Sequence, residues 1–345
     1  MIHGGDVISY KDKYNGDIID FSSNINPLGP PLGLREEMNR AYSELTAYPD
    51  IYYRELKESI AAYLGCGAGE VITGNGALEI INNVCVMFNR TVVFTPCFSE
   101  YMKRPVVLGR EVIKLHLNDE FEIDIEKLEV NLKPKDLLIL GNPNNPTGLR
   151  ISEQILRRIY DVVIQKNAFL LLDEAFFEFC PTDYDSVKIF QDAGNICVIR
   201  AATKFFALPG IRLGYGFAAH DFAEKYGRIE SPWSVNSYAN GAGRVIFREN
   251  DYIKNTKEYI KREREYLSNM LSEIEWIKVY RSDANFILIK LLKYDEDIVF
   301  NELIKNSIMI RKASSFEGLD NSYIRIAVKD RKSNNKLIRL FKEFE

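Results

Sequence analysis

Apolar residues follow two different patterns along the chain. Between about residues 35 and 235, short apolar runs with the length of buried strands alternate with segments whose apolar residues recur at helical spacing. The helical spacing is clearest over 152–166, where Leu156, Ile159 and Val163 recur three and four residues apart. The apolar runs lie at 71–73, 91–95, 136–140, 168–172 and 195–199. This alternation predicts an α/β domain with a mostly parallel sheet flanked by helices.

The two ends of the chain depart from this alternation. The first 33 residues are rich in Gly, Pro and Asn and end in NINPLGPPLG, so we expect an extended arm there. A charged helix over 251–273 precedes alternating segments at 277–280, 285–290 and 323–328. We therefore expect an arm over 1–33 that packs with the C-terminal domain, a large domain over 34–240 and a smaller α+β domain over 241–345.

Composition and charge exclude several classes of function. The 45 Lys and Arg against 49 Asp and Glu give a net charge of −4 without a basic tract, so binding of nucleic acid is not expected. No apolar stretch approaches the ~18 residues of a membrane span, and the charged start lacks the apolar core of a signal peptide. The five scattered cysteines and three histidines form no C-x-x-C or H-E-x-x-H motif, which predicts free thiols in the cytoplasm and no metal site.

Residues suited to chemistry follow each apolar run of the predicted large domain. They include a glycine turn, an aromatic residue, an amide, a carboxylate and an amine, namely Gly76, Phe98, Asn145, Asp173 and Lys204. The carboxyl ends of parallel strands meet at one edge of a doubly wound sheet, and ligands bind at that edge. We therefore expect these five residues to converge on one pocket.

The residue types in this set point to one cofactor. A glycine turn at a helix start suits a phosphate, and Arg212 can bind a phosphate through two hydrogen bonds. A carboxylate at the end of a buried strand, such as Asp173, needs a cationic partner. A lysine in a dry pocket near cations, such as Lys204, has a lowered pKa and attacks carbonyl groups. Phosphate, protonated ring nitrogen and aldehyde occur together in pyridoxal 5′-phosphate.

Four segments in this order resemble a known family. They read TGNGALE at 73–79, NPNNPTG at 142–148, LLDEAFFEF at 171–179 and ATKFFALPGIRLGYG at 202–216. Asn145 and Asp173 are 28 residues apart, Asp173 and Lys204 are 31 apart, and Arg212 follows Lys204 by eight. The chain resembles, over essentially its whole length, the fold-type I pyridoxal-phosphate enzymes of the class I/II aminotransferase family.

The resemblance implies roles for two catalytic residues and a set of cofactor contacts. Lys204 would hold the cofactor as a Schiff base and then act as acid and base at the substrate carbon. Asp173 would keep the ring nitrogen protonated. The other implied contacts are Asn145 on the phenolic oxygen, Phe98 on the ring face, and Gly76, Ala77, Thr203 and Arg212 at the phosphate.

The resemblance also implies a partner subunit and a substrate clamp. Tyr48, in AYPD, resembles the tyrosine that reaches the phosphate from the other subunit of a homodimer. Arg325, in YIRIAV, resembles the arginine that binds the acid group of the substrate, and Arg311 would supply a second clamp. The remaining expected substrate contacts are Asn26, His3, Trp233 and Asn236.

Two positions depart from the pattern of the family. Phe176 stands where a tyrosine usually bonds the phenolic oxygen, and Ala201 stands where a serine usually binds the phosphate. Both departures remove a hydroxyl group from the expected cofactor site without touching the groups that make or break bonds.

Shorter segments point to one branch of the family. HGGD at 3–6, DFSSNINPLGPP at 20–31 and PWSVN at 232–236 resemble the branch that contains L-threonine O-3-phosphate decarboxylase of the cobalamin pathway and histidinol-phosphate aminotransferase. HGGD and PWSVN favour the decarboxylase, and the aminotransferase, with 2-oxoglutarate as amino acceptor, is the alternative. The outcome depends on which bond of the α-carbon stands perpendicular to the cofactor ring, and a sequence does not place a bond at that accuracy.

Two other classes of function compete with this one. A dinucleotide-dependent oxidoreductase would need G-x-G-x-x-G after its first strand, and GNGALE at 74–79 does not supply it. A regulator that keeps the fold without catalysis would need a DNA-binding module, and no basic helix-turn-helix pattern is evident. The presence of both Lys204 and Asp173 also favours an enzyme.

Overall fold

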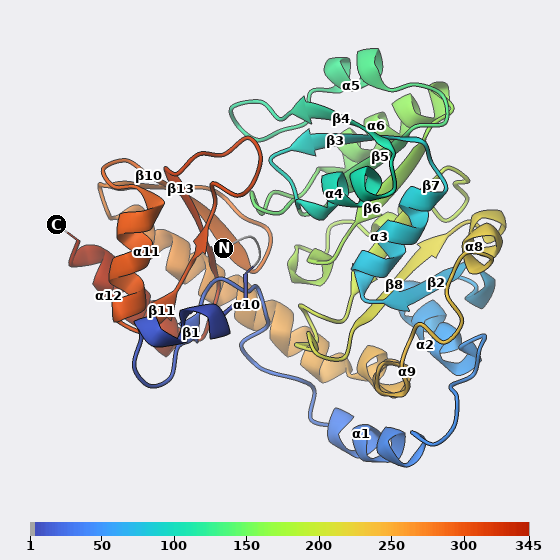
Figure 1. Ribbon diagram of the computed structural model, residues 1–345, viewed down its shortest axis with the longest axis horizontal. Helices are drawn as coiled ribbons and strands as arrows, with labels where there is room; N and C mark the ends of the chain where they lie inside the picture. Colours follow the sequence, from blue (N-terminus) through green and yellow to red (C-terminus); the bar gives the residue numbers. More distant parts are fainter. Residues whose placement is uncertain (1–3, 345) are drawn as a thin grey trace.

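The computed structural model describes residues 4–344, which form a large part around a seven-stranded sheet and a small part around a four-stranded sheet (Figure 1). The strand order of the large sheet is β2-β8-β7-β6-β5-β3-β4. β8 runs antiparallel to its two neighbours, and the other pairs in this sheet are parallel. The bounds are β2 (Val71–Asn75), β3 (Arg90–Thr95), β4 (Glu111–His116), β5 (Leu137–Gly141), β6 (Phe169–Asp173), β7 (Ile196–Ala201) and β8 (Leu213–Ala218). The predicted α/β fold with a mostly parallel sheet is confirmed.

Both faces of the large sheet are apolar because helices cover each of them. Leu171 of β6 and Ile199 of β7 belong to one core, whereas Leu170 and Val198 belong to the other. Helices α3 (Ala77–Val86), α4 (Glu100–Val107) and α8 (His220–Gly227) pack on the first face. Helices α2 (Arg54–Leu64), α5 (Ile125–Asn131) and α6 (Glu153–Gln165) pack on the second. Burial on both faces explains why the strands read as continuous apolar runs.

The sequence of the N-terminal arm predicts an extended segment, and the structure corrects that in part. Residues Ile8–Lys13 form a 3-10 helix, η1, in a stretch that contains neither Gly nor Pro. The short strand β1 (Ile19–Asp20) pairs in parallel with β11 (Ile308–Met309), so the arm lies against the C-terminal elements (Figure 1). After the arm, α1 (Leu34–Ser43) packs against α9 (Ser237–Val245). The domain boundary expected at residue 240 falls inside α9.

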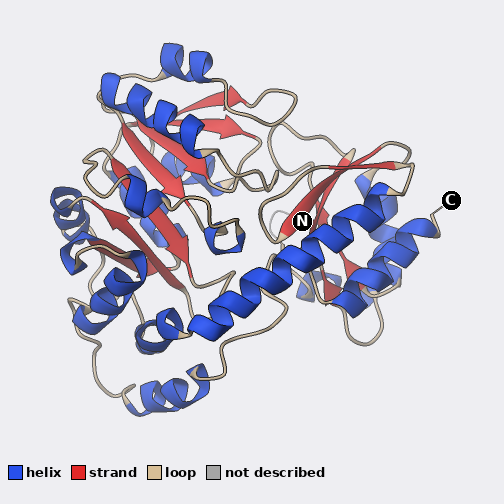
Figure 2. Ribbon diagram, turned by 180° about the vertical axis from the view of Figure 1, so that it is seen from behind, coloured by secondary structure: helices blue, strands red, loops and turns tan. Residues whose placement is uncertain are grey.

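The small part is an antiparallel sheet with helices on its outer side. Its strand order is β12-β13-β10-β9, with β9 (Ile277–Val279), β10 (Phe286–Leu291), β12 (Arg311–Lys312) and β13 (Tyr323–Ala327). The long helix α10 (Asn250–Ser272) runs from the large part to the back of this sheet (Figure 2), and α11 (Glu296–Lys305) and α12 (Arg331–Lys342) complete the unit. Buried residues recur along α10 at Thr256, Ile260, Leu267 and Leu271. Within residues 4–344, no helix is long and apolar enough to cross a membrane.

Candidate active site

A cavity of about 270 Å³ lies at the carboxyl ends of the parallel strands, with walls from both parts of the molecule. The turns after β3, β5, β6 and β7 supply residues to it, as the sequence predicts. Arg212 reaches the same edge because β8 runs in the opposite direction and begins there. The expected residues that line the cavity are Ala77, Phe98, Asn145, Asp173, Thr203, Lys204, Arg212, Arg311 and Arg325.

Lys204 follows the end of β7 and is surrounded by cations. Burial first, and then the positive charges of Arg325, Arg212 and Lys329 in that order, lower the pKa of its amine to about 8. The backbone carbonyl of Lys204 accepts a hydrogen bond from the backbone N–H of Asn26 at 3.1 Å, which holds this segment against the arm. An amine with a pKa near 8 is neutral in part of the molecules at physiological pH and can attack a carbonyl group.

Asp173 is the last residue of β6 and accepts two hydrogen bonds. The Tyr101 hydroxyl donates to its Oδ2 at 2.8 Å, and the backbone N–H of Ala175 donates to its Oδ1 at 2.9 Å. Burial raises the pKa of Asp173, and these two bonds oppose the rise. The carboxylate is thus held in one orientation at the cavity wall. Among the described residues that line the cavity, Asp173 is the one acidic side chain.

Tyr101 is a site residue that the sequence analysis did not identify. It lies in the first turn of α4, and its ring packs edge-on against Phe98 at 5.6 Å between centroids. The only sequence signal is its position three residues after Phe98, and a buried core aromatic would show the same spacing. Its hydroxyl is the feature that distinguishes it, since a buried tyrosine needs a hydrogen-bond partner.

The start of α3 and the guanidinium of Arg212 form a site for an anion. Gly76 precedes α3 with a φ of 79°, and a Cβ at this position would lie 2.3 Å from Nη2 of Arg212. A glycine is therefore required here for its backbone conformation and for the space that Arg212 fills. Ala77 and Leu78, in the first turn of α3, line the cavity. The first N–H groups of a helix have no acceptor within the helix, so an anion can bind them.

Two buried arginines form the opposite wall. Arg311 of β12 and Arg325 of β13 are direct cross-strand partners, and both line the cavity. Arg325 donates to Oδ1 of Asn145 and to the carbonyl of Ser22, and Arg311 donates to Oγ of Ser315 at 2.6 Å. Burial first, and then the charge of Arg311, lower the pKa of Arg325 to about 9. Two guanidinium groups placed this close in a buried wall favour an anionic ligand.

The N-terminal arm completes the wall beside Arg325. Ser22, Ser23 and Gly4 line the cavity. The carboxylate of Asp20 accepts hydrogen bonds from the backbone N–H and the hydroxyl of Ser22, at 2.8 and 2.6 Å. Gly4 approaches the carbonyl of Ser22 so closely that a Cβ there would lie 2.0 Å from the oxygen. The first described residues therefore fold back over the wall that carries Arg325.

Two expected substrate contacts have other partners in the structure and do not line the cavity. The side-chain amide of Asn26 donates to the carbonyl of Phe205 and the hydroxyl of Tyr252, both at 2.8 Å. Asn236 precedes α9 and caps it, because its Oδ1 accepts from the N–H of Ala239 at 3.0 Å. Short polar side chains serve as helix caps for this reason, and a sequence does not separate that role from ligand binding.

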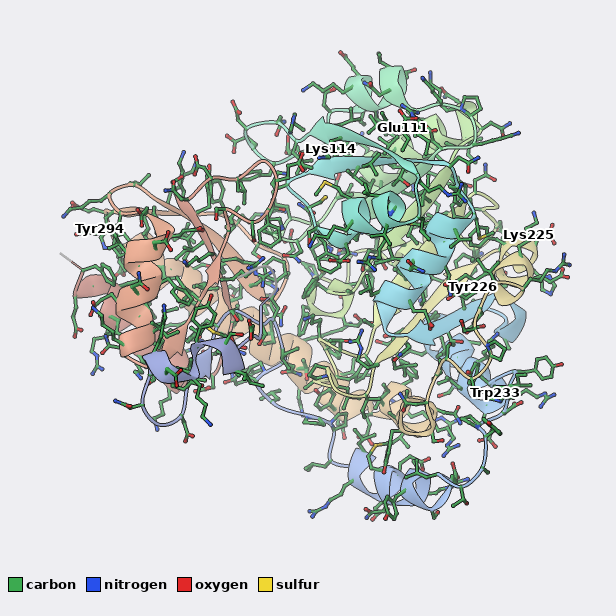
Figure 3. The ribbon with its side chains drawn as sticks, viewed as in Figure 1. Glu111, Lys114, Lys225, Tyr226, Trp233 and Tyr294 are labelled. Atoms are coloured by element: carbon green, nitrogen blue, oxygen red, sulfur yellow. The ribbon has the colours of Figure 1, made fainter. Side chains whose placement is uncertain are left out.

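The other expected contacts lie at the surface or outside the described residues. Tyr48 is 80% exposed, and its ring contacts that of Trp233 in a tilted arrangement, with 4.6 Å between ring centroids. Figure 3 shows Trp233 at the outer edge of the molecule, on the side away from the small part. His3 lies outside the residues that the structure describes. Phe176 and Ala201, the two departures from the family pattern, both line the cavity.

Comparisons with known proteins agree in one family. The model of the family described as aminotransferase class I and II matches residues 16–341. A protein of Caldanaerobacter subterraneus subsp. tengcongensis, named as a candidate threonine-phosphate decarboxylase, is 39% identical over 97% of this chain and 92% of its own. Histidinol-phosphate aminotransferase 2 of Archaeoglobus fulgidus is 33% identical over 96% of this chain and 95% of its own. The crystal structure of the histidinol-phosphate aminotransferase from Clostridium acetobutylicum is 34% identical, with a TM-score of 0.90 over 94% of this chain and 98% of that one.

Proposed function

The chain belongs to the class I and II aminotransferase family, and on this basis we propose that it acts on a small amino acid that carries a phosphate ester. Its cofactor is pyridoxal 5′-phosphate, which the enzymes of this family use. The reaction we favour is decarboxylation of L-threonine O-3-phosphate. The observation that carries this proposal is the pair of buried arginines, Arg311 and Arg325, on the wall opposite the cofactor residues.

The described residues fit the cofactor group by group. The first N–H groups of α3 and the guanidinium of Arg212 suit the phosphate, and the absence of a Cβ at Gly76 is what lets Arg212 come this close to the helix start. Asp173 suits a protonated ring nitrogen because burial makes an unpaired carboxylate costly there. Lys204 would hold the aldehyde carbon, Asn145 the phenolic oxygen and Phe98 the ring face. When bound, the cofactor draws electrons from the bonds of the substrate α-carbon.

Lys204 is the residue that we assign to proton transfer. In decarboxylation the α-carbon loses carbon dioxide and gains a proton in its place, and in transamination it first loses a proton. The amine of Lys204, with a pKa of about 8, can hold and give a proton near neutral pH. Tyr101 and the N–H of Ala175 hold the Asp173 carboxylate in place while this happens.

The arginine pair suits a substrate with two anionic groups. Threonine O-3-phosphate carries a carboxylate and a phosphate on one small molecule, whereas histidinol phosphate carries no carboxylate. Arginine binds either group through two parallel hydrogen bonds. The alternative, a histidinol-phosphate aminotransferase, is supported by the 34% identity and TM-score of 0.90 to the enzyme of Clostridium acetobutylicum. Its second substrate, 2-oxoglutarate, would then occupy the arginines.

One pair of assays separates the two reactions. The purified, cofactor-loaded protein is given L-threonine O-3-phosphate, and carbon dioxide is followed. In parallel it is given histidinol phosphate with 2-oxoglutarate, and glutamate is followed. Carbon dioxide without glutamate supports the decarboxylase. Glutamate without carbon dioxide refutes it and establishes the aminotransferase.

We also propose that the protein is a homodimer and that Tyr48 reaches the site of the partner subunit. Tyr48 does not line the cavity of its own chain, and α1 and the segment after it stand apart from the large sheet (Figure 1). Several exposed apolar side chains lie between residues 28 and 52, and exposed apolar surface is typical of a region that binds another protein. They are Leu28, Leu32, Tyr42, Leu45, Tyr48, Ile51 and Tyr52.

A further inference from the structure

A buried polar cluster lies next to the strand ends that carry the cofactor residues. It is formed by Asn142, Glu174, Ser186 and Arg200, and we call it the strand-end cluster. Glu174 and Asn142 have no exposed surface, and Arg200 is 2% exposed. None of the four lines the cavity. Buried charges are costly, so a cluster at this place needs a reason.

Glu174 is the centre of the strand-end cluster because both of its oxygens are used. Oε1 accepts from Nδ2 of Asn142 at 3.1 Å and from the hydroxyl of Ser186 at 2.6 Å. Oε2 accepts from Nε and Nη2 of Arg200, at 3.2 and 3.0 Å. Burial alone would lower the pKa of Arg200, but the carboxylates of Glu174, Asp185 and Glu178 raise it. Burial raises the pKa of Glu174, and the charge of Arg200 opposes that rise.

The members of the cluster are tied to three neighbouring strands, each of which leads to a cavity residue. Asn142 directly follows β5, and Asn145 comes three residues later. Glu174 directly follows Asp173 at the end of β6. Arg200 lies in β7, four residues before Lys204. The backbone bonds agree, because Asn142 N–H donates to the carbonyl of Asp173 at 2.8 Å and Glu174 N–H donates to that of Ile199 at 2.7 Å.

We propose that Glu174 is a positioning residue that fixes Asn145, Asp173 and Lys204 relative to one another. The carboxylate joins the ends of β5, β6 and β7 on the side of the strands away from the cavity. A small displacement of any of the three cofactor residues would misalign groups that must act on one ring. The proposal rests on the assignment of these residues to the cofactor, and it holds for either substrate.

A matched pair of substitutions tests this proposal. Glu174→Gln keeps the shape but places an amide N–H₂ group against Arg200 or Asn142, where a donor would face a donor. The control is Glu178→Gln, because Glu178 is equally buried and accepts from the Tyr215 hydroxyl at 2.8 Å, with no bond to the three strand ends. For each variant, the dissociation constant of pyridoxal 5′-phosphate is measured by absorbance titration without substrate. Thermal unfolding of the cofactor-free protein is measured separately.

The expected result separates positioning from stability. We expect cofactor binding to weaken about tenfold in Glu174→Gln and to change by less than about twofold in Glu178→Gln, even where both lower the unfolding temperature. Equal cofactor affinity in the two variants would overturn the proposal.

If Glu174→Gln does not fold, Ser186→Ala provides a second test. This variant removes one hydrogen bond to Glu174 and leaves the ion pair of Glu174 with Arg200, and cofactor binding should weaken about threefold. Unchanged binding in Ser186→Ala would then overturn it. These outcomes need no substrate, so they do not depend on which reaction the enzyme catalyses.

Discussion

The two walls of the cavity are built in different ways. The wall from the large part is made of turns that follow neighbouring strands of the sheet, and each turn delivers at least one functional side chain. The opposite wall combines the arm near Ser22 with the cross-strand pair Arg311 and Arg325. These two arginines follow Ser22 in the chain by about 300 residues. The first wall is fixed by a rigid sheet, whereas the second depends on contacts between distant segments. We therefore expect the first wall to govern cofactor chemistry and the second to govern the choice of substrate.

The largest effect should come from Lys204 on the first wall. Lys204→Ala removes the amine, and we expect turnover to fall by more than about 10⁴-fold. Borohydride reduction followed by mass spectrometry should attach the cofactor to the wild-type chain and not to the variant. Lys204→Arg keeps a positive charge without a nucleophilic amine, and it should be equally inactive. Activity near the wild-type level in either variant would contradict the role assigned to Lys204.

Arg311 should give the next largest effect, and it should leave the cofactor unaffected. Arg311→Ala removes a buried cation from the second wall, and we expect kcat/KM to fall about 100-fold, mainly through KM. The cofactor dissociation constant should stay within about twofold. The matched control is Lys312→Ala, the next residue of β12, whose side chain pairs with Asp297. A loss of cofactor binding in Arg311→Ala would show that the second wall also binds the cofactor, which would contradict the assignment of cofactor binding to the first wall alone.

Substitution of Tyr48 tests whether a segment of the partner subunit also contributes to the cofactor site. Tyr48→Ala should weaken cofactor binding about tenfold if its hydroxyl binds the phosphate across the interface. The control is Tyr52→Ala, which also removes an exposed tyrosine from the same apolar surface. Light scattering gives the mass of each variant, and absorbance titration gives its cofactor affinity. Equal losses of affinity in both variants would mean that Tyr48 acts only through the interface.

The difference between the walls also explains what the sequence could predict. The five apolar runs form strands close to where they are expected, because buried parallel strands have a strong signature. Of the five residues expected to converge after them, Phe98, Asn145, Asp173 and Lys204 line the cavity, whereas Gly76 does not and its neighbour Ala77 does. The sequence pattern does not reveal β4, because it is an edge strand with one buried residue, Leu115. It does not reveal β8 either, because the LGYGFA sequence of this strand contains two glycines. Tyr101, Ser22 and the roles of Asn26 and Asn236 depend on which segments meet in space. No local pattern in the sequence carries that information.

The smallest predicted effect is that of Arg325, on the second wall, on the pKa of Lys204, on the first wall. Among the charges near Lys204, that of Arg325 lowers the pKa of the amine most, after burial itself. Arg325→Gln removes this charge, which favours the protonated amine and should raise its pKa by about half a unit, a change of ~0.7 kcal/mol. The midpoint of the pH dependence of cofactor uptake should therefore move up from about 8. Arg281→Gln, an exposed arginine paired with Asp283, should leave it unchanged.

The lowered pKa of Lys204 also predicts how the stability of the cofactor-free protein depends on pH. The folded-state pKa of Lys204 is about 8 and its ordinary value is 10.5, so between these values the unfolded chain binds more protons than the folded one. The free energy of unfolding should therefore rise with pH from about 8 to 10.5, and Arg325→Gln should narrow that window from its lower end. Urea titrations across this range measure the slope. Arg325→Gln could also leave unchanged both the midpoint of cofactor uptake and the pH range over which the free energy of unfolding rises. That result would show that the wall with Arg325 does not affect the pKa of Lys204, so that cofactor chemistry depends on the first wall alone.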